Sequence, residues 1–295
     1  MCCSMDLKLA KVLSWLQKNM DGEVSMTEDT ISTVCNDVAE ALRKQFASST
    51  NRREFKARPS NLGKPLCQLQ MEKKGEKGVA PSYNFILRMM VGDIVEAVLK
   101  GVIKEANIEG YKSSQNLSTK IGEHIITGEA DLSFDDGRVD DIKSTSDFAF
   151  RNKFISWNAL KEKDSFGYVT QLHVYASATG KPAGGIWAMN IATGELNRIE
   201  STDTKEEVSN ILKEAEKKID ALVSDAPFER CFEDEPETFN RVLTGNRKLG
   251  MECSWCKYRF SCWPNLQERE SVFSKAKSKP IVAYTELNSM GEETA

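Results

Sequence analysis

Asp131, Asp141 and Lys143 lie close together in the sequence and combine side chains that could do metal-assisted chemistry. They belong to the segments Gly128–Asp131 and Val139–Lys143. Two carboxylates favour Mg²⁺ or Mn²⁺, hard cations that prefer oxygen ligands. Such a metal activates a bound water and neutralises charge on phosphate oxygens, and a neighbouring lysine orients or deprotonates that water. The alternative is a surface hairpin whose alternating charges face solvent.

The turn between the two segments decides whether these residues meet. Asp141 and Lys143 are two apart, so a strand over 138–144 places both on one face. A three-residue loop with Gly137 in the left-handed conformation would set Asp131 opposite Asp141. A two-residue loop would turn Asp131 to the other face of the sheet.

Two further groups of polar residues accompany this stretch. Glu96 lies on a predicted helix over 83–107 and supplies either a third carboxylate or a polar notch on a core helix. Gln171 and Tyr175 are four apart, so they share one face of a predicted helix over 165–178. They are either site residues or an amphipathic packing pair.

The cysteines form a second constellation. Cys253, Cys256 and Cys262 have the spacing C-x2-C-x5-C, which indicates a thiolate metal site. Zinc and iron–sulfur sites usually take four ligands, so Cys67 or Cys231 would complete the set. Cys67 would join the two ends of the core, and closing a long loop is where a metal stabilises most. Thiolates suit both Zn²⁺ and an iron–sulfur cluster.

The remaining pattern indicates an α/β fold with a mixed central sheet flanked by helices. We expect a helical N-terminal region over 1–57, a core over 58–265 closed by the cysteine-cluster segment, and a loosely ordered polar tail over 266–295. The other expected elements are helices over 5–20, 27–46 and 204–223, and strands over 124–134, 184–190 and 195–199.

Composition narrows the function class. The net charge of −4 argues mildly against a protein that coats nucleic acid, although a local patch can still grip DNA. No apolar run approaches the roughly 18 residues of a membrane span, and we find no secretory signal, so we expect a cytoplasmic protein without a membrane partner. No GxxxxGK[ST] phosphate loop is present, so the chain has no helicase motor of its own.

In this order and spacing, the motifs GDIVE, GEAD, VDDIKS and QLHVY and the split cysteine set resemble the RecB-like branch of the PD-(D/E)XK nuclease superfamily. They look most like its iron–sulfur exonucleases, the CRISPR-associated RecB-like nucleases and the AddB-type nuclease domain. The resemblance covers about residues 58–264 and implies a restriction-endonuclease-like core.

The resemblance also implies roles for individual residues. Asp131, Asp141 and Glu96 would be metal ligands, and Lys143 would be the catalytic lysine. Many RecB-like members have a histidine where this chain has Glu96, whereas lambda-type exonucleases have a glutamate, which leaves the metal preference open. The other implied residues are the QxxxY pair Gln171 and Tyr175, and the [4Fe–4S] ligands Cys67, Cys253, Cys256 and Cys262.

The expected function is that of a Mg²⁺- or Mn²⁺-dependent DNA exonuclease in recombination or repair, acting at duplex ends or on single strands. It would work in the cytoplasm, or the host cytoplasm for a viral protein, as a homo-oligomer or with a helicase or recombination partner. Two alternatives stay open: a non-catalytic, zinc-stapled DNA-binding accessory protein, and a structure-specific endonuclease on the same fold. The sequence does not specify the polarity of digestion, the strand preference or the pathway.

Overall fold

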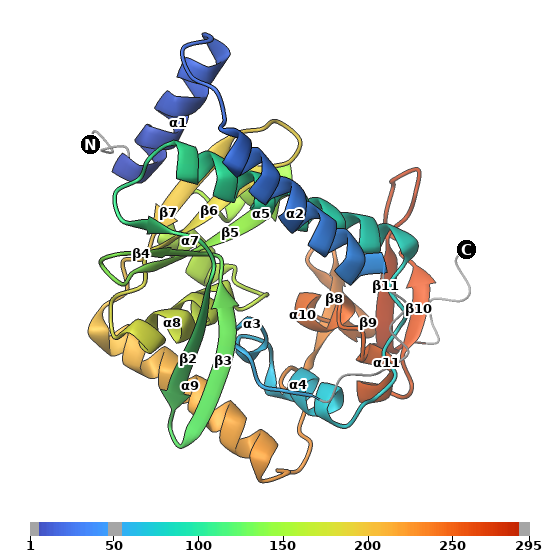
Figure 1. Ribbon diagram of the computed structural model, residues 1–295. Helices are drawn as coiled ribbons and strands as arrows, with labels where there is room; N and C mark the ends of the chain where they lie inside the picture. The colour runs from blue at the N-terminus through green and yellow to red at the C-terminus, as the bar shows by residue number, and fades with distance from the viewer. Residues whose placement is uncertain (1–5, 47–54, 289–295) are drawn as a thin grey trace. The chain divides into compact units, whose positions relative to one another are not determined.

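The computed structural model describes residues 6–46 and 55–288 (Figure 1). The chain forms two compact units. The first contains residues up to 63 and 82–221, and the second contains 64–81 and the chain from 222 onward. Their boundaries differ from the predicted ranges 1–57, 58–265 and 266–295, parts of which, at 1–5, 47–54 and 289–295, lie outside the described residues.

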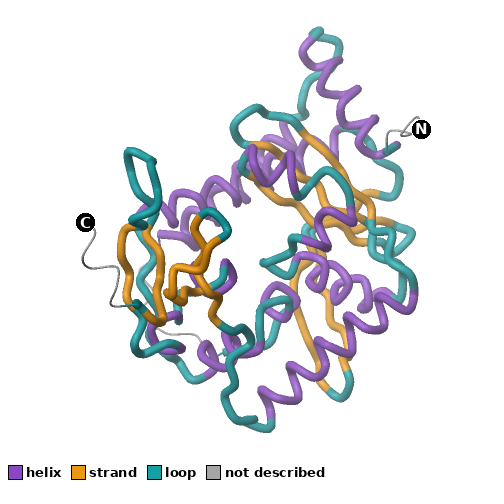
Figure 2. Tube along the Cα trace, turned by 180° about the vertical axis from the view of Figure 1, so that it is seen from behind, coloured by secondary structure: helices purple, strands orange, loops and turns teal. Residues whose placement is uncertain are grey.

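The first unit is built on a five-stranded mixed sheet with the order β1-β4-β5-β6-β7. β5 and β6 run parallel, and the other neighbours are antiparallel. The strands are β1 (Tyr111–Lys112), β4 (Leu132–Phe134), β5 (Val139–Thr145), β6 (Gly185–Asn190) and β7 (Leu196–Glu200). A separate hairpin, β2 (Gln115–Ile121) and β3 (His124–Ala130), forms a long ribbon in Figures 1 and 2.

Helices flank the sheet of the first unit. Those of the N-terminal half are α1 (Leu7–Met20), α2 (Glu28–Phe46), α3 (Pro59–Leu62) and α5 (Tyr83–Glu105). Those that follow the sheet strands are α6 (Asp147–Asn152), α7 (Trp157–Glu162), α8 (Tyr168–Thr179) and α9 (Lys205–Val223). The predicted α/β class with a mixed central sheet is therefore confirmed.

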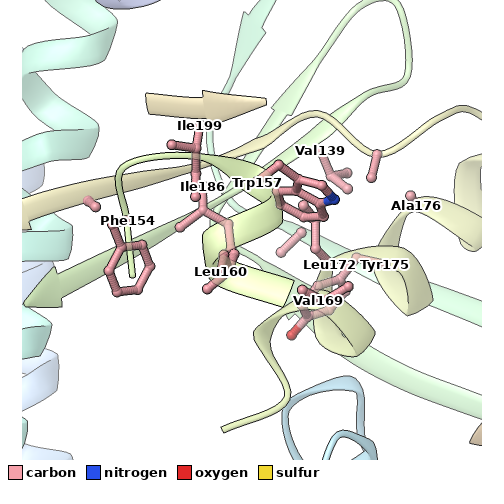
Figure 3. Packing of buried hydrophobic residues seen from close by; sticks show 13 residues of the cluster. Val139, Phe154, Trp157, Leu160, Val169, Leu172, Tyr175, Ala176, Ile186 and Ile199 are labelled. Carbon is pink, nitrogen blue, oxygen red and sulfur yellow. The ribbon is translucent and has the colours of Figure 1, made fainter. Parts of the chain in front are cut away.

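Two apolar cores occupy opposite faces of the sheet. Val12 of α1 and Leu99 of α5 pack with Ile142 on one face. Leu160 of α7 and Leu172 of α8 pack with Val139 on the other, as Figure 3 shows. Side chains alternate along a strand, so Asp141 and Lys143 share the face of Val139, towards α8.

The second unit contains a four-stranded antiparallel sheet with the order β10-β11-β9-β8. Its strands are β8 (Asp234–Phe239), β9 (Val242–Leu249), β10 (Gln267–Glu270) and β11 (Ile281–Glu286). Its helices are short: α4 (Leu66–Lys73), α10 (Met251–Ser254) and α11 (Arg259–Cys262).

The expectation of a loosely ordered polar tail over 266–295 is wrong for residues 267–286. Two strands of the second unit, β10 and β11, lie there. Ala283 and Tyr284 of β11 are buried, and Ala283 packs against Leu249 and Leu266. The short apolar run Ile281–Tyr284 was the available signal, but it acquires a buried face only within a sheet, between neighbouring β10 and distant β9.

Within the described ranges, no helix is both long and apolar enough to cross a membrane.

Candidate functional site

The turn between β4 and β5 has the register of the three-residue loop, one of the two alternatives that the sequence left open. Leu132 pairs with Asp140, and Gly137 closes the loop in the left-handed region with φ of 81°. Continued by one residue, this register brings Asp131 across from Asp141. The geometric condition for a shared carboxylate site is therefore met, and a glycine is required because other residues rarely adopt this φ.

Asp131 lies at a break in the predicted strand 124–134. It separates β3 from β4, and its carboxylate accepts a hydrogen bond of 2.8 Å from the backbone N–H of Ile142. Burial and the nearby Asp141 carboxylate raise the pKa of Asp131 to about 7. Asp131 is thus fixed by the backbone of β5 beside a second acid.

Asp141 is the most enclosed acid of the site, with only 2% of the residue exposed. One carboxylate oxygen accepts a hydrogen bond of 3.0 Å from the Gln171 side-chain amide, and the other forms an ion pair with the Lys143 ammonium. Burial opposes the charge on Lys143, but Asp141 and then Asp131 outweigh it and raise the pKa of the lysine. Lys143 is therefore a firmly held cation.

The predicted pair Gln171 and Tyr175 faces the carboxylates from α8. Burial, followed by the charges of Asp131 and Asp141, raises the pKa of the Tyr175 hydroxyl. Tyr175 approaches strand β3 so closely that a Cβ at Gly128 would lie 3.0 Å from its ring. The glycine of the GEAD motif thus makes room for the tyrosine of the QLHVY motif, and the two residues are site neighbours.

Glu96 points to the same site from α5 and brings a lysine that the sequence analysis missed. The ammonium of Lys100 forms an ion pair with Glu96 and donates a 2.8 Å hydrogen bond to the Ser114 hydroxyl. Burial and the charge of Asp131 raise the pKa of Glu96, and Lys100 opposes this shift. Lys100 also lines a cavity of about 1080 Å³ with Glu129. Its spacing of four from Glu96 was a usable signal.

Tyr168 is the second residue that the sequence analysis missed. It begins α8, and the Lys143 ammonium lies 5.0 Å from the centre of its ring. This distance suits a cation–π interaction. Nothing in the spacing of Tyr168 along the chain distinguishes it, because the contact joins a strand and a helix that meet only in the folded protein.

The carboxylate set has the chemistry of a divalent-cation site. Asp131 and Asp141 repel each other, and Glu96 interacts unfavourably with both. A bound cation would relieve this repulsion, and Lys143 and Lys100 now offset part of it. As the side chains stand, no three histidine, cysteine or acidic residues in the described ranges form a group able to hold a metal ion. Binding would therefore require side-chain rearrangement.

The cysteines gather in the second unit. The backbone N–H of Cys67 donates to the Cys231 sulfur at 3.1 Å, which places both candidates for the fourth ligand side by side. Burial and the neighbouring Cys262 and Cys256 raise the pKa of the Cys253 thiol to about 11. A metal would reverse this preference because it binds the thiolate. Thiolates suit a soft-ligand centre, and five of the cysteines that the structure describes, not four, lie in this region. As placed, no three of these described cysteines form a group able to hold a metal ion.

Neither a protein-family model nor a curated protein matches the sequence. Among solved structures, the chain is similar to one described as "Crystal structure of SSO0001", with a TM-score of 0.40 and 16% sequence identity. The similarity covers 79% of this chain and 96% of the other. A likeness at this level contributes nothing to a functional assignment, which must come from the geometry of the site.

Proposed function

We propose that this protein is a metal-dependent DNA exonuclease of the PD-(D/E)XK type, in its RecB-like branch. The observation that carries the proposal is the convergence of Asp131, Asp141 and Lys143 on one face of the β4–β5 hairpin. Glu96 from α5 and Gln171 from α8 join them, so the motifs that are separate in the sequence meet at one place.

Each residue of the set has a chemical task in this proposal. Asp131, Asp141 and Glu96 would hold Mg²⁺ or Mn²⁺, which supplies an activated water and neutralises the phosphate. Lys143 offers a permanent positive charge beside the reacting phosphate, and its ion pair with Asp141 fixes its position. Gln171 keeps the Asp141 carboxylate in one orientation through its hydrogen bond.

We further propose that the cysteine region binds a [4Fe–4S] cluster, with Zn²⁺ as the alternative. Cys253, Cys256 and Cys262 supply three thiolates, and the fourth comes from Cys67 or its neighbour Cys231. Four thiolates match both centres. Absorbance near 400 nm with iron and labile sulfide would identify the cluster, and zinc in a colourless protein would identify the alternative.

The function is tested by comparing Asp141→Asn and Lys143→Met with the wild type on end-labelled single- and double-stranded DNA, with Mg²⁺ and with Mn²⁺. We expect each variant to lose cleavage by about 10³-fold or more, because Asp141→Asn weakens a metal ligand and Lys143→Met removes the positive charge beside the reacting phosphate. Asp136→Asn is the matched control, since this exposed acid lies in the hairpin loop next to the site. Thermal unfolding checks that all variants fold.

Three results would redirect the proposal. Full cleavage by Asp141→Asn would remove this site from the reaction. A wild type that binds DNA but does not cut it with either metal would favour the zinc-stapled accessory protein. Cutting of circular single strands, which have no ends, would favour the endonuclease.

A further inference from the structure

An exposed aromatic ring lies beside the proposed active site. Phe166 is 64% exposed, although its loop is firmly held. The Asp164 carboxylate accepts hydrogen bonds from the backbone N–H groups of Gly167 (2.9 Å) and Val169 (2.8 Å). The loop therefore presents a large apolar side chain to solvent at a fixed position.

The Phe166 ring continues inward as a stack that reaches Lys143. Its centre lies 5.6 Å from that of Tyr168, and the two ring planes differ by 17°. The Lys153 ammonium nitrogen lies 5.1 Å from the centre of the Phe166 ring and 4.7 Å from that of Tyr168. The Lys153 side chain is 90% buried. The inner ring, Tyr168, contacts the Lys143 ammonium. Two parallel rings thus connect the surface with the proposed catalytic lysine.

We propose that Phe166 and Tyr168 form a stacking platform for a nucleobase of single-stranded DNA next to the bond that is cut. This inference rests on the proposed nuclease function and adds its substrate class. A nucleotide whose phosphate contacts Lys143 would bring its base to the adjacent rings. Aromatic rings bind bases of any sequence because every base has a stacking face.

The platform favours a single strand over an intact duplex. A base inside a duplex is already stacked on both faces, and it reaches a protein ring only after unstacking. A single strand needs no such step. The ring pair therefore selects unpaired DNA at the site, whether it comes from a single strand or from a frayed duplex end.

Binding is measured with the full-length protein and a fluorescent oligonucleotide of about 20 thymidines, without added divalent cation. We expect Phe166→Ala to weaken binding about 5- to 100-fold and Phe166→Leu to weaken it similarly, whereas Phe166→Trp retains it. Phe148→Ala is the matched control, because Phe148 is also exposed and its ring stacks on no other described ring. It should bind like the wild type.

A second measurement leaves the protein unchanged and alters the DNA. Abasic sites are placed one at a time along the oligonucleotide near the cleaved bond. The wild type should lose affinity at one position, and Phe166→Ala should be insensitive there. The wild-type series of this test does not depend on how a Phe166 variant folds.

Wild-type affinity in Phe166→Ala, or equal losses in Phe166→Ala and Phe148→Ala, would overturn the platform. An abasic series without a sensitive position would do the same. If Asp141→Asn abolishes cleavage while Phe166→Ala binds normally, only the platform fails. If the wild type cuts no DNA but Phe166→Ala loses single-strand binding, the nuclease proposal fails and the platform stands.

Discussion

The carboxylate site and the cysteine region differ in what holds their side chains in place. In the first unit, Glu96, Asp131 and Asp141 each have a protein partner, through an ammonium, a backbone N–H or a side-chain amide. The partners belong to α5, β5 and α8, and the sheet that contains β5 has apolar cores on both faces. Among its described residues, the second unit has a small core cluster of buried Leu249, Leu266 and Ala283, with Cys253 and Trp263 packed against it.

The carboxylate side chains are positioned by the fold itself, whereas the cysteine side chains would be positioned by a bound metal. Cys253, Cys256 and Cys262 lie on or next to helices of four residues, α10 and α11, which have little stability of their own. Small units with a small core commonly depend on a metal or another cross-link. We therefore expect loss of the bound metal to unfold the second unit and to leave the first unit's core formed.

The largest expected effect is that of Cys253→Ser. If a metal centre holds the second unit together, this change should remove the metal and with it a folding contribution on the order of 10 kcal/mol. Metal analysis and thermal unfolding measure both effects. Cys35→Ser, at an exposed cysteine of α2, is the control and should change neither. Unchanged metal content in Cys253→Ser would show that this cysteine does not bind a metal, and the second unit would then not depend on a metal centre that includes it.

Cys67→Ser and Cys231→Ser sharpen the same test. The two residues lie side by side, so either could supply the fourth ligand. We expect Cys67→Ser to lose the metal and Cys231→Ser to keep it, because the resemblance that predicts the cluster includes Cys67. The opposite result would reassign the ligand and leave the metal site intact.

The next effect concerns the stability of the carboxylate site without metal. Asp131 has a pKa of about 7 when folded and near 4 when unfolded, so folding favours its protonated form. The stability it contributes is complete below pH 4 and is lost as the pH rises to about 7. Asp131→Asn has no carboxylate to ionise, so it should not lose stability as the pH rises. Above pH 7 its free energy of unfolding should exceed that of the wild type by on the order of a few kcal/mol.

Unfolding temperatures of both proteins, measured from pH 4 to pH 8 without added divalent cation, test this expectation. Added Mg²⁺ should narrow the difference at high pH by stabilising the wild type. If the unfolding temperatures of the two proteins differed by the same amount at every pH, Asp131 would not titrate as its surroundings indicate.

Lys100→Met should have a smaller, kinetic effect. Lys100 opposes the raised pKa of Glu96 and Asp131, so its loss should shift the pH–activity profile to higher pH and slow cleavage at neutral pH by about 10- to 100-fold. A purely structural role would lower stability without moving the profile. Lys104→Met, one turn further along α5 and paired with exposed Asp29, should leave the profile unchanged.

The smallest effect is that of Gly128→Ala. The added Cβ would crowd the rings of Tyr175 and Pro59, at 3.0 Å and 2.9 Å, and should reduce stability by about 1 kcal/mol. Because Tyr175 would have to shift, we also expect a modest loss of cleavage. Ser118→Ala, at an exposed position of the paired strand β2, is the control for an added or lost small group. Equal stability and equal cleavage in both variants would show that Tyr175 is not held in a fixed position at the site.

The local parts of the molecule follow from the sequence alone. The amphipathic patterns predict α1, α2 and α9 to within a few residues. The loop Asp135–Gly137 determines the register of the hairpin, because a glycine in the left-handed conformation at its third position selects one pairing. The sequence left a two-residue loop open as well, so the meeting of Asp131 and Asp141 was one of two predicted arrangements.

Only the tertiary structure decided the contacts between distant segments. The Tyr168 ring contacts the Lys143 ammonium, and the positive charge of Lys100 lies near Glu96 and Asp131. Cys67 contacts Cys231, which is 164 residues away in the sequence. The run Ile281–Tyr284 becomes a strand through pairing with β10 along its length and with distant β9 at Tyr284. Local periodicity carries no record of such partners, because these contacts depend on how whole elements pack against one another and bury their apolar faces.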